Sequence, residues 1–228
     1  MRHRALQTAT ILTAALAAYP AYGQHSHEGH GHSAPHAVGQ SSGFYLPEPL
    51  PLEPFTLVDH EALPFTRDRL EGRWTLLVFG YTHCPDVCPV TLAQVRDTQA
   101  LLEQQSSALD VAAVFVSIDP ERDTPERVAA YVAAFDEDLI GVTGTAEAIA
   151  AFAGQFRVKY APTRRSRGDY LMDHSSSVAL LTPRAELAAL FSVPLRPERL
   201  AADLRAIAEP SGGGDEGAPV REAIGGGN

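Results

Sequence analysis

Two cysteines, the only two of this chain, stand four residues apart in the segment FGYTHCPDVCP, residues 79–89. If the chain from Cys84 to Cys88 were helical, a rise of about 1.5 Å per residue would place their Cα atoms roughly 6 Å apart, toward the long end of what a disulfide bridges. The pair can therefore be a dithiol, a disulfide or two ligands of one metal ion. A static disulfide is the weakest of these readings, because closing so short a loop removes little entropy from the unfolded chain. Two thiolates suit Cu(I), and one imidazole would complete a three-coordinate site.

The segments around the cysteines alternate between strand-like and helix-like patterns. This alternation predicts an α/β domain, with a central mixed β-sheet flanked by helices. Short apolar runs predict the strands, and apolar residues that recur on one helical face predict the helices. Asp123 or Thr124 is expected to cap one helix, with Pro125 in its first turn. The expected strands are 74–80, 110–119, 139–142, 176–183 and 188–194, the last two an antiparallel pair; the expected helices are 89–105, 123–135, 145–156 and 196–208.

This order places both cysteines in the loop between a buried strand and the helix that follows it. Unpaired N–H groups and the positive end of the dipole at a helix start stabilise a thiolate by about 0.3–1 kcal/mol, which lowers its pKa. Pro85 and Pro89 stiffen the loop, because the residue before a proline avoids the α region. We therefore expect Cys84 in the extended loop and Cys88 near the helix entry, with Pro89 in the first turn.

Three histidines of the predicted domain, His60, His83 and His174, are candidates for a third metal ligand. His83 adjoins Cys84, but the turn from strand to loop is expected to direct its ring elsewhere, and His60 lies in an early polar loop. His174 precedes a predicted strand that would lie beside the cysteine loop if the sheet closes as in thioredoxin-like folds. We favour His174, while the residues alone leave open that it is a hydrogen-bonded loop residue.

The N-terminal segment, residues 1–23, has the pattern of an export signal. Basic residues precede a mildly apolar stretch, and the small-x-small sequence Ala21-Tyr22-Gly23 follows it. The apolar part is shorter than the roughly 20 residues of a membrane span, so we favour cleavage over a retained anchor. Either way the protein is expected in the periplasm or at the outer face of the cytoplasmic membrane, where an oxidising environment closes a thiol pair unless a reductant keeps it open.

Polar segments flank the domain predicted at 49–208. Residues 24–48 are rich in Gly, Ser, Pro and His and predict a flexible linker. Its imidazoles would bind Cu, Ni or Zn loosely, or the segment is simply a polar tether. Residues 209–228 are Gly-rich and charged and predict a disordered tail. The linker histidines are His25, His27, His30, His32 and His36.

The charge distribution limits the partners. The formal net charge is −10, and no block of Lys or Arg occurs, so nothing supports nucleic-acid binding. An acidic surface favours solubility and cationic partners.

Three ordered motifs, FGYTHCPDVCPVTL, VFVSIDPERDTPE and YLMDHSSSVALLTP, resemble those of the Sco/SenC family, and the resemblance covers about residues 50–207. It implies a thioredoxin-like fold and a role in assembling the copper centre of cytochrome c oxidase. It also implies that Cys84, Cys88 and His174 are ligands of Cu(I) or Cu(II). Asp119 and Pro120 match a family signature whose expected role is to shape a loop. The family commonly keeps a membrane anchor.

Two functions follow as hypotheses. The first is a metallochaperone, not an enzyme, that passes copper by ligand exchange to the copper-binding subunit of cytochrome c oxidase and depends on a periplasmic thiol reductant. The second is a thiol–disulfide oxidoreductase that reduces the cysteines of that copper site through a mixed disulfide. Loss of His174 should abolish only the first. A peroxiredoxin-like peroxidase is disfavoured, because that chemistry needs Thr or Ser three residues before the reactive cysteine, where this chain has Tyr81.

Overall fold

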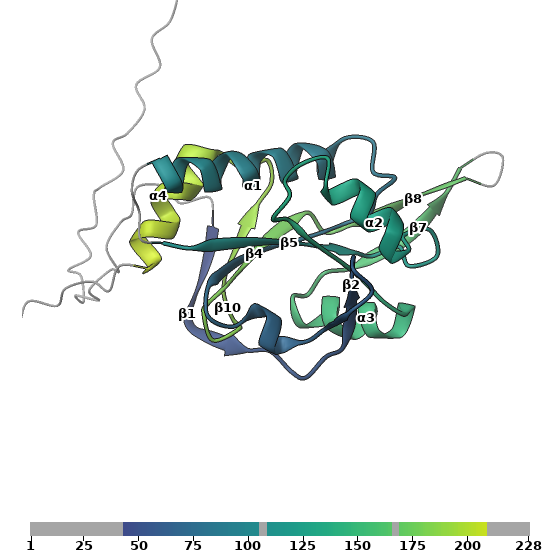
Figure 1. Cartoon of the computed structure of the whole chain (residues 1–228), viewed down its shortest axis with the longest axis horizontal. Helices are drawn as coiled ribbons and strands as arrows, with labels where there is room; N and C mark the ends of the chain where they lie inside the picture. The colour runs from purple at the N-terminus through teal and green to yellow at the C-terminus, as the bar shows by residue number, and fades with distance from the viewer. Residues whose placement is uncertain (1–42, 105–108, 166–168, 209–228) are drawn as a thin grey trace, which may run out of the picture. The chain divides into compact units, whose positions relative to one another are not determined.

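The computed structural model describes residues 43–104, 109–165 and 169–208 (Figure 1). The predicted signal, the predicted tail and residues 24–42 of the predicted linker lie outside these ranges. The strands are β1 (Gly43–Pro51), β2 (Leu57–Asp59), β3 (Pro64–Phe65), β4 (Trp74–Gly80), β5 (Val111–Ser117), β6 (Ile140–Thr143), β7 (Tyr160–Arg164), β8 (Tyr170–His174), β9 (Ser177–Leu181) and β10 (Glu186–Ser192). The helices are α1 (Val87–Gln104), α2 (Pro125–Val132), α3 (Ala146–Gln155), α4 (Pro197–Ala208) and the short 3₁₀ helix η1 (Arg67–Leu70).

Eight strands form one mixed sheet in the order β1-β10-β9-β4-β5-β6-β2-β3. The parallel strands β4, β5 and β6 lie in the middle, and β9 pairs antiparallel with β4. Nearly every residue of β4 and β5 is buried, as expected for parallel strands covered on both faces. The predicted central mixed sheet is therefore confirmed, and β9 lies beside the strand that leads into the cysteine loop.

Helices cover both faces of this sheet, and each face has its own hydrophobic core. Helices α1, α2 and α4 lie on one face, and α3 lies on the other with η1 (Figure 1). Leu92 and Val128 belong to the first core. Phe152 and Leu70 belong to the second. Because α1 is packed on the central strands along its length, the start of that helix is held firmly at the end of β4.

The predicted helices are present, with shifted ends. Thr124 caps α2, and its hydroxyl accepts from the N–H of Arg127. This helix ends at Val132, not at Phe135 as predicted, because the chain there tightens: the N–H of Phe135 donates to the carbonyl of Val132, three residues back. Helix α1 begins at Val87, two residues earlier than expected, so that Cys88 is its second residue.

The predicted boundary of the linker at residue 48 is wrong, because residues 43–48 belong to β1, the edge strand that pairs with β10. A composition rich in Gly, Ser, Pro and His suggested a linker over residues 24–48, but an edge strand tolerates the proline at residue 47, since its outer N–H groups need no partner. Phe44 on this strand is 68% exposed. The short elements β2, β3, η1, β7 and β8 were also missed. Among the described residues, no helix has the length and apolar character that crossing a membrane requires.

Candidate metal site

The two cysteines occupy the connection from β4 to α1, as predicted. The N–H of Cys84 donates to the carbonyl of Tyr81, 3.1 Å away, which turns the chain after the strand. Cys88 lies in the first turn of α1 and is buried, and its N–H is 3.4 Å from the sulfur of Cys84. Both cysteines are free thiols. The unpaired N–H groups at the helix start therefore face the Cys84 sulfur and favour its thiolate.

Gly80, the last residue of β4, leaves room for the buried sulfur. A Cβ atom built on Gly80 would lie 2.8 Å from the Cys88 Sγ and 2.9 Å from a ring carbon of Phe115. Both distances are shorter than side chains tolerate, so a larger residue would displace Cys88. The absence of a side chain at this position is thus a requirement of the site.

His174 approaches the cysteines from a separate element, the two-stranded hairpin of β7 and β8. Its Nε2 is 3.9 Å from the Sγ of Cys88. Its Nδ1 is 3.0 Å from the carbonyl oxygen of Ser175. Since a carbonyl only accepts, the proton is on Nδ1, and the lone pair of Nε2 faces the sulfur. The ring also makes an edge contact with Tyr81, with centroids 6.2 Å apart.

The other two candidate histidines face elsewhere. The Nδ1 of His83 is 3.2 Å from the hydroxyl of Thr82 and 3.8 Å from a carboxylate oxygen of Asp123. The Nδ1 of His60 accepts a hydrogen bond from the N–H of Gly141, near the opposite edge of the sheet. The structure therefore brings His174, and neither His60 nor His83, to the cysteine pair.

The two thiols differ strongly in acidity. The Cys88 thiol donates to the Cys84 sulfur, and the N–H groups of Asp86 and Cys88 add to this, so the pKa of Cys84 is lowered to about 5. Burial opposes this shift. The same hydrogen bond, together with burial, raises the pKa of Cys88 far above its ordinary value. At neutral pH the pair therefore holds one proton, on Cys88.

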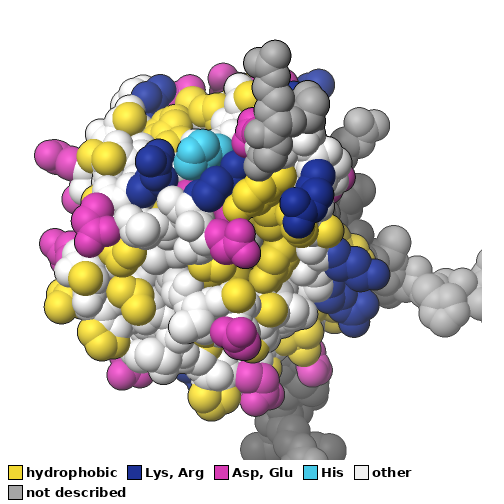
Figure 2. All heavy atoms as spheres, turned by 90° about the vertical axis from the view of Figure 1, so that its right-hand side faces the viewer, with side chains coloured by type: hydrophobic (Ala, Val, Ile, Leu, Met, Phe, Trp, Pro, Cys, Tyr) yellow, Lys and Arg dark blue, Asp and Glu magenta, His cyan; other side chains and the backbone are white. Residues whose placement is uncertain are grey.

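The site opens into a pocket of about 290 Å³ between the cysteine loop and the hairpin. In Figure 2 the end of the molecule with α2 and the β7–β8 hairpin faces the viewer, and a histidine lies there among Lys or Arg side chains. Within the described ranges, no three His, Cys, Asp or Glu side chains form a ready-made metal cage. The Cys88 sulfur and the Nε2 of His174 are nevertheless neighbours, 3.9 Å apart. The pocket is lined by Tyr81, Cys84, Pro85, Asp86, Val87, Met172, Asp173, His174 and Ser176.

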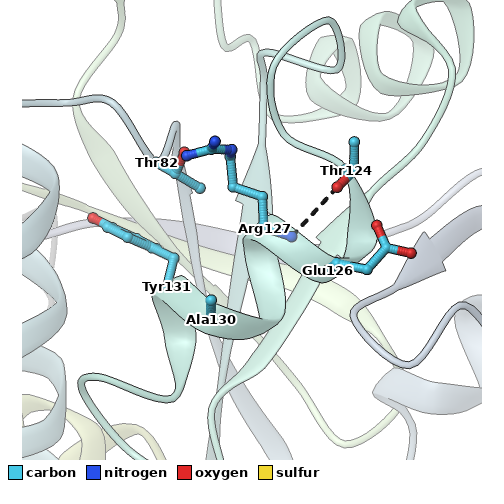
Figure 3. Close-up of a pocket in the computed structure, with 6 residues that line it drawn as sticks. All are labelled: Thr82, Thr124, Glu126, Arg127, Ala130 and Tyr131. Atoms are coloured by element: carbon cyan, nitrogen blue, oxygen red, sulfur yellow. Dashed lines mark hydrogen bonds between the residues drawn. The ribbon is translucent and has the colours of Figure 1, made fainter.

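A second depression, of about 570 Å³, is lined mainly by residues at the start of α2 (Figure 3). Its six lining residues include neither Cys nor His, so it does not extend the metal site. They are Thr82, Thr124, Glu126, Arg127, Ala130 and Tyr131.

Asp123 is a residue of the site region that sequence reasoning considered only as a helix cap. Its carboxylate is fully buried and accepts three hydrogen bonds: from the N–H of Thr82 at 2.9 Å, from the Thr82 hydroxyl at 2.6 Å and from the Ser117 hydroxyl at 2.6 Å. Asp123 thereby fixes the start of the cysteine loop to the end of β5. Its presence in the motif SIDPERDTP was the signal that could have revealed this role.

Asp119, in the same motif, shapes the loop as expected. Its buried carboxylate accepts from the Arg122 Nε at 2.6 Å and from the Tyr170 hydroxyl at 2.7 Å. Tyr170 begins β8, so Asp119 connects the loop after β5 to the hairpin that carries His174.

Comparison with known proteins places these features in a family. The SCO1/SenC family model matches residues 47–209. A mitochondrial SCO1 homologue of Arabidopsis thaliana is 42% identical over 130 residues, which are 57% of this chain and 39% of the relative. The human mitochondrial SCO1 homologue is 35% identical over 167 residues, 73% of this chain and 56% of the relative. The chain thus spans about two fifths to just over half the length of these relatives.

Solved structures give the same fold. Copper-bound ScoI of Arabidopsis thaliana matches with a TM-score of 0.65 and 36% identity, covering 68% of this chain and 95% of the other. Apo Sco1 of Thermus thermophilus matches with a TM-score of 0.65 and 34% identity, covering 75% and 99%. The thioredoxin-like fold is confirmed, and copper is the metal held by the solved relative. The family model matches more than two thirds of this chain. The chain therefore belongs to the SCO1/SenC family.

Proposed function

We propose that this protein binds copper through Cys84, Cys88 and His174 and passes it to the copper-binding subunit of cytochrome c oxidase. The observation that carries the proposal is that the Nε2 of His174 lies 3.9 Å from the buried Cys88 sulfur, while Cys84 and His174 line one open pocket. Two thiolates and an imidazole form a soft ligand set that suits Cu(I). A putative copper-binding protein of Stutzerimonas stutzeri, 31% identical over 72% of this chain and 79% of its own length, adds support.

The residues divide the work of holding and releasing the ion. Cys84 offers a thiolate at neutral pH, and Cys88 gives up its proton when copper arrives. The hydrogen bond from Nδ1 to Ser175 holds the His174 ring with Nε2 toward the sulfurs. Cys84 and His174 are only partly buried. A donor of the acceptor protein can therefore reach the ion while this protein still holds it, and the copper is never released to water.

Thiol–disulfide exchange is the second candidate, and the unequal acidity of the two thiols favours it. The partly buried Cys84 is the thiolate that would attack a disulfide, and the fully buried Cys88 is the thiol that would resolve the mixed disulfide. This chemistry needs both sulfurs and does not need His174. Replacing His174 therefore distinguishes the two functions, because only copper binding should depend on it.

The test is a titration of the reduced protein with Cu(I), under anaerobic conditions and against a chromophoric Cu(I) chelator. We expect one tightly held equivalent, lost in Cys84→Ser and Cys88→Ser and strongly weakened in His174→Ala. His83→Ala and His60→Ala are matched controls, since each removes an imidazole directed away from the sulfurs. Undiminished uptake without the cysteines would overturn the site. If His174→Ala kept full affinity as well as disulfide exchange, the redox function would be the better reading.

We also propose that the protein is exported, as residues 1–23 predict. A similar protein of Bacillus anthracis, 26% identical with a TM-score of 0.61 over 72% of this chain and 99% of its own, is named a SCO1/SenC family lipoprotein, which supports export. Fractionation of expressing cells, with mass spectrometry of the mature N-terminus, tests both the location and the choice between a cleaved signal and an anchor. Recovery of the protein in the cytoplasm with residues 1–23 intact would contradict export.

A further inference from the structure

Strand β8 turns one face toward the domain, and three of its residues share that face. Side chains alternate along a strand, so Tyr170, Met172 and His174 point the same way. Met172 is buried in the core on the α3 side of the sheet, whereas Asp173, on the opposite face, is exposed. Among the described strands, β8 forms a ladder with β7 alone and does not join the large sheet. The position of His174 therefore depends on how the inward side chains of β8 are held.

Arg122 holds the first of these side chains in three ways. Its Nη1 donates to the backbone carbonyl of Tyr170 at 3.0 Å, and its guanidinium carbon lies 3.6 Å from the centre of the Tyr170 ring. Its Nε donates to Asp119, which also accepts from the Tyr170 hydroxyl. The backbone, ring and hydroxyl of Tyr170 are thus all fixed by one arginine and its carboxylate partner.

The same guanidinium also reaches the cysteine loop. Its carbon lies 5.8 Å from the centre of the Tyr81 ring, and the edge of that ring contacts His174. Asp123, the next residue, anchors Thr82 in the cysteine loop. The loop after β5 therefore binds both elements that carry the proposed copper ligands.

We propose that Arg122 is a positioning residue that sets the distance of His174 from the cysteine pair, an inference that rests on the proposed function. His174 lies four positions after Tyr170 on the strand, about 13 Å away at a rise of roughly 3.3 Å per residue. Tyr170 and Met172 are two anchors on one face, and two anchors fix both the place and the tilt of the strand. If the anchor at Tyr170 is released, the strand can pivot about Met172, and the imidazole at its other end moves.

The chemistry of this anchor requires arginine. The planar guanidinium group of arginine can donate to a carboxylate through Nε and to a carbonyl through Nη1 while its face stacks on an aromatic ring. The ammonium group of lysine is not planar and cannot do all three. Both Arg122→Gln and Arg122→Lys should therefore release Tyr170. The lysine variant keeps the charge beside the buried Asp119, and it serves if the glutamine variant folds poorly.

The experiment measures Cu(I) affinity of the reduced full-length protein by anaerobic competition. Loss of a residue that orients a metal ligand typically weakens binding 10–100-fold, so we expect a loss of about that size in both variants. Arg69→Gln is the matched control. Arg69 also pairs with a buried carboxylate, Asp59, and lies 5.9 Å from the centre of an aromatic ring, but at the β2–β3 edge of the sheet. This control should bind copper within about twofold of the parent.

A double variant separates positioning from general damage. Because Arg122 is proposed to act through the imidazole, Arg122→Gln should cause no further loss of affinity in the His174→Ala background. The midpoint potential of the Cys84–Cys88 couple, which needs no histidine, should match the parent in Arg122→Lys. NMR signals of the His174 ring should broaden or shift in the apo variant.

Two outcomes would overturn the inference: unchanged affinity in both Arg122 variants, or an equal loss with and without His174. If His174→Ala itself bound copper normally, the proposed function would fail instead. If His174→Ala bound weakly while both Arg122 variants bound normally, only the role of Arg122 would be lost.

Discussion

The affinity of the reduced protein for Cu(I) should rise about tenfold per unit of pH between pH 7 and pH 8. At the proposed site copper binds the deprotonated thiols, so each proton that it displaces makes the affinity change by a factor of ten per pH unit, or about 1.4 kcal/mol. The pKa of Cys84 is lowered to about 5, so this group has already lost its proton in that range. The pKa of Cys88 is raised well above the range, so binding displaces one proton.

The direction of this pH dependence follows from the same two thiols. Lowering the pH favours the protonated thiols and weakens binding. The thiol contribution to the slope stays near one proton per ion until the pH approaches 5, where Cys84 also begins to take up a proton. The assay is anaerobic competition with a Cu(I) chelator of known pH dependence, in steps of 0.25 pH unit. Proton release into weakly buffered solution during titration gives an independent count.

Two ordinary thiols would behave differently, because both would still be protonated at pH 7 with pKa values near 8.5. Binding would then displace nearly two protons, and affinity would change almost a hundredfold per pH unit. A slope close to two between pH 7 and 7.5 would refute the shared-proton arrangement of the Cys84–Cys88 pair. A slope close to zero would refute it as well, since it would mean that neither thiol holds a proton.

Three further outcomes are expected. At pH 6 iodoacetamide should modify Cys84 well before Cys88, because Cys84 is ionised and accessible whereas Cys88 is protonated and 2% exposed. Peptide mapping by mass spectrometry measures the order of labelling. Preferential labelling of Cys88 would contradict the assignment of the thiolate to Cys84. Asp123→Ala removes a buried carboxylate that accepts three hydrogen bonds, so it should lower the free energy of unfolding, measured in urea, by about 3 kcal/mol. A decrease below about 1 kcal/mol would show that other contacts hold the cysteine loop. Gly80→Ala should push the Cys88 sulfur aside, which should cost about 1–3 kcal/mol of stability and weaken copper binding at least about tenfold. Gly154→Ala is the control, because an added Cβ there has no neighbour within 4 Å, and it should change neither stability nor copper affinity in this way.

The strongest local patterns in the sequence were enough to predict the centre of the fold. The strand Trp74–Gly80 was predicted with its observed bounds, since a continuous apolar run is what a strand buried on both faces requires. Of the two caps predicted for α2, Asp123 or Thr124, it is Thr124 that accepts from the N–H of Arg127, and such a cap can be predicted because it depends on neighbours along the chain. Strand β1 was missed because its prolines are tolerated only at an edge, and the order of strands decides where the edge is.

The sequence by itself determined the chemistry that we propose for this protein: the residue types at Cys84, Cys88 and His174, and the position of both cysteines at a helix start, where N–H groups favour a thiolate. Only the tertiary structure brought His174, and neither His60 nor His83, beside the sulfurs, made the two thiols unequal in acidity, and joined Arg122 to the hairpin and Asp123 to the cysteine loop. The physical reason is the distance along the chain over which each interaction acts. Helix capping and burial patterns act between residues a few positions apart, whereas Cys88 and His174 are 86 residues apart and meet only because β9 pairs with β4 and the hairpin packs beside it.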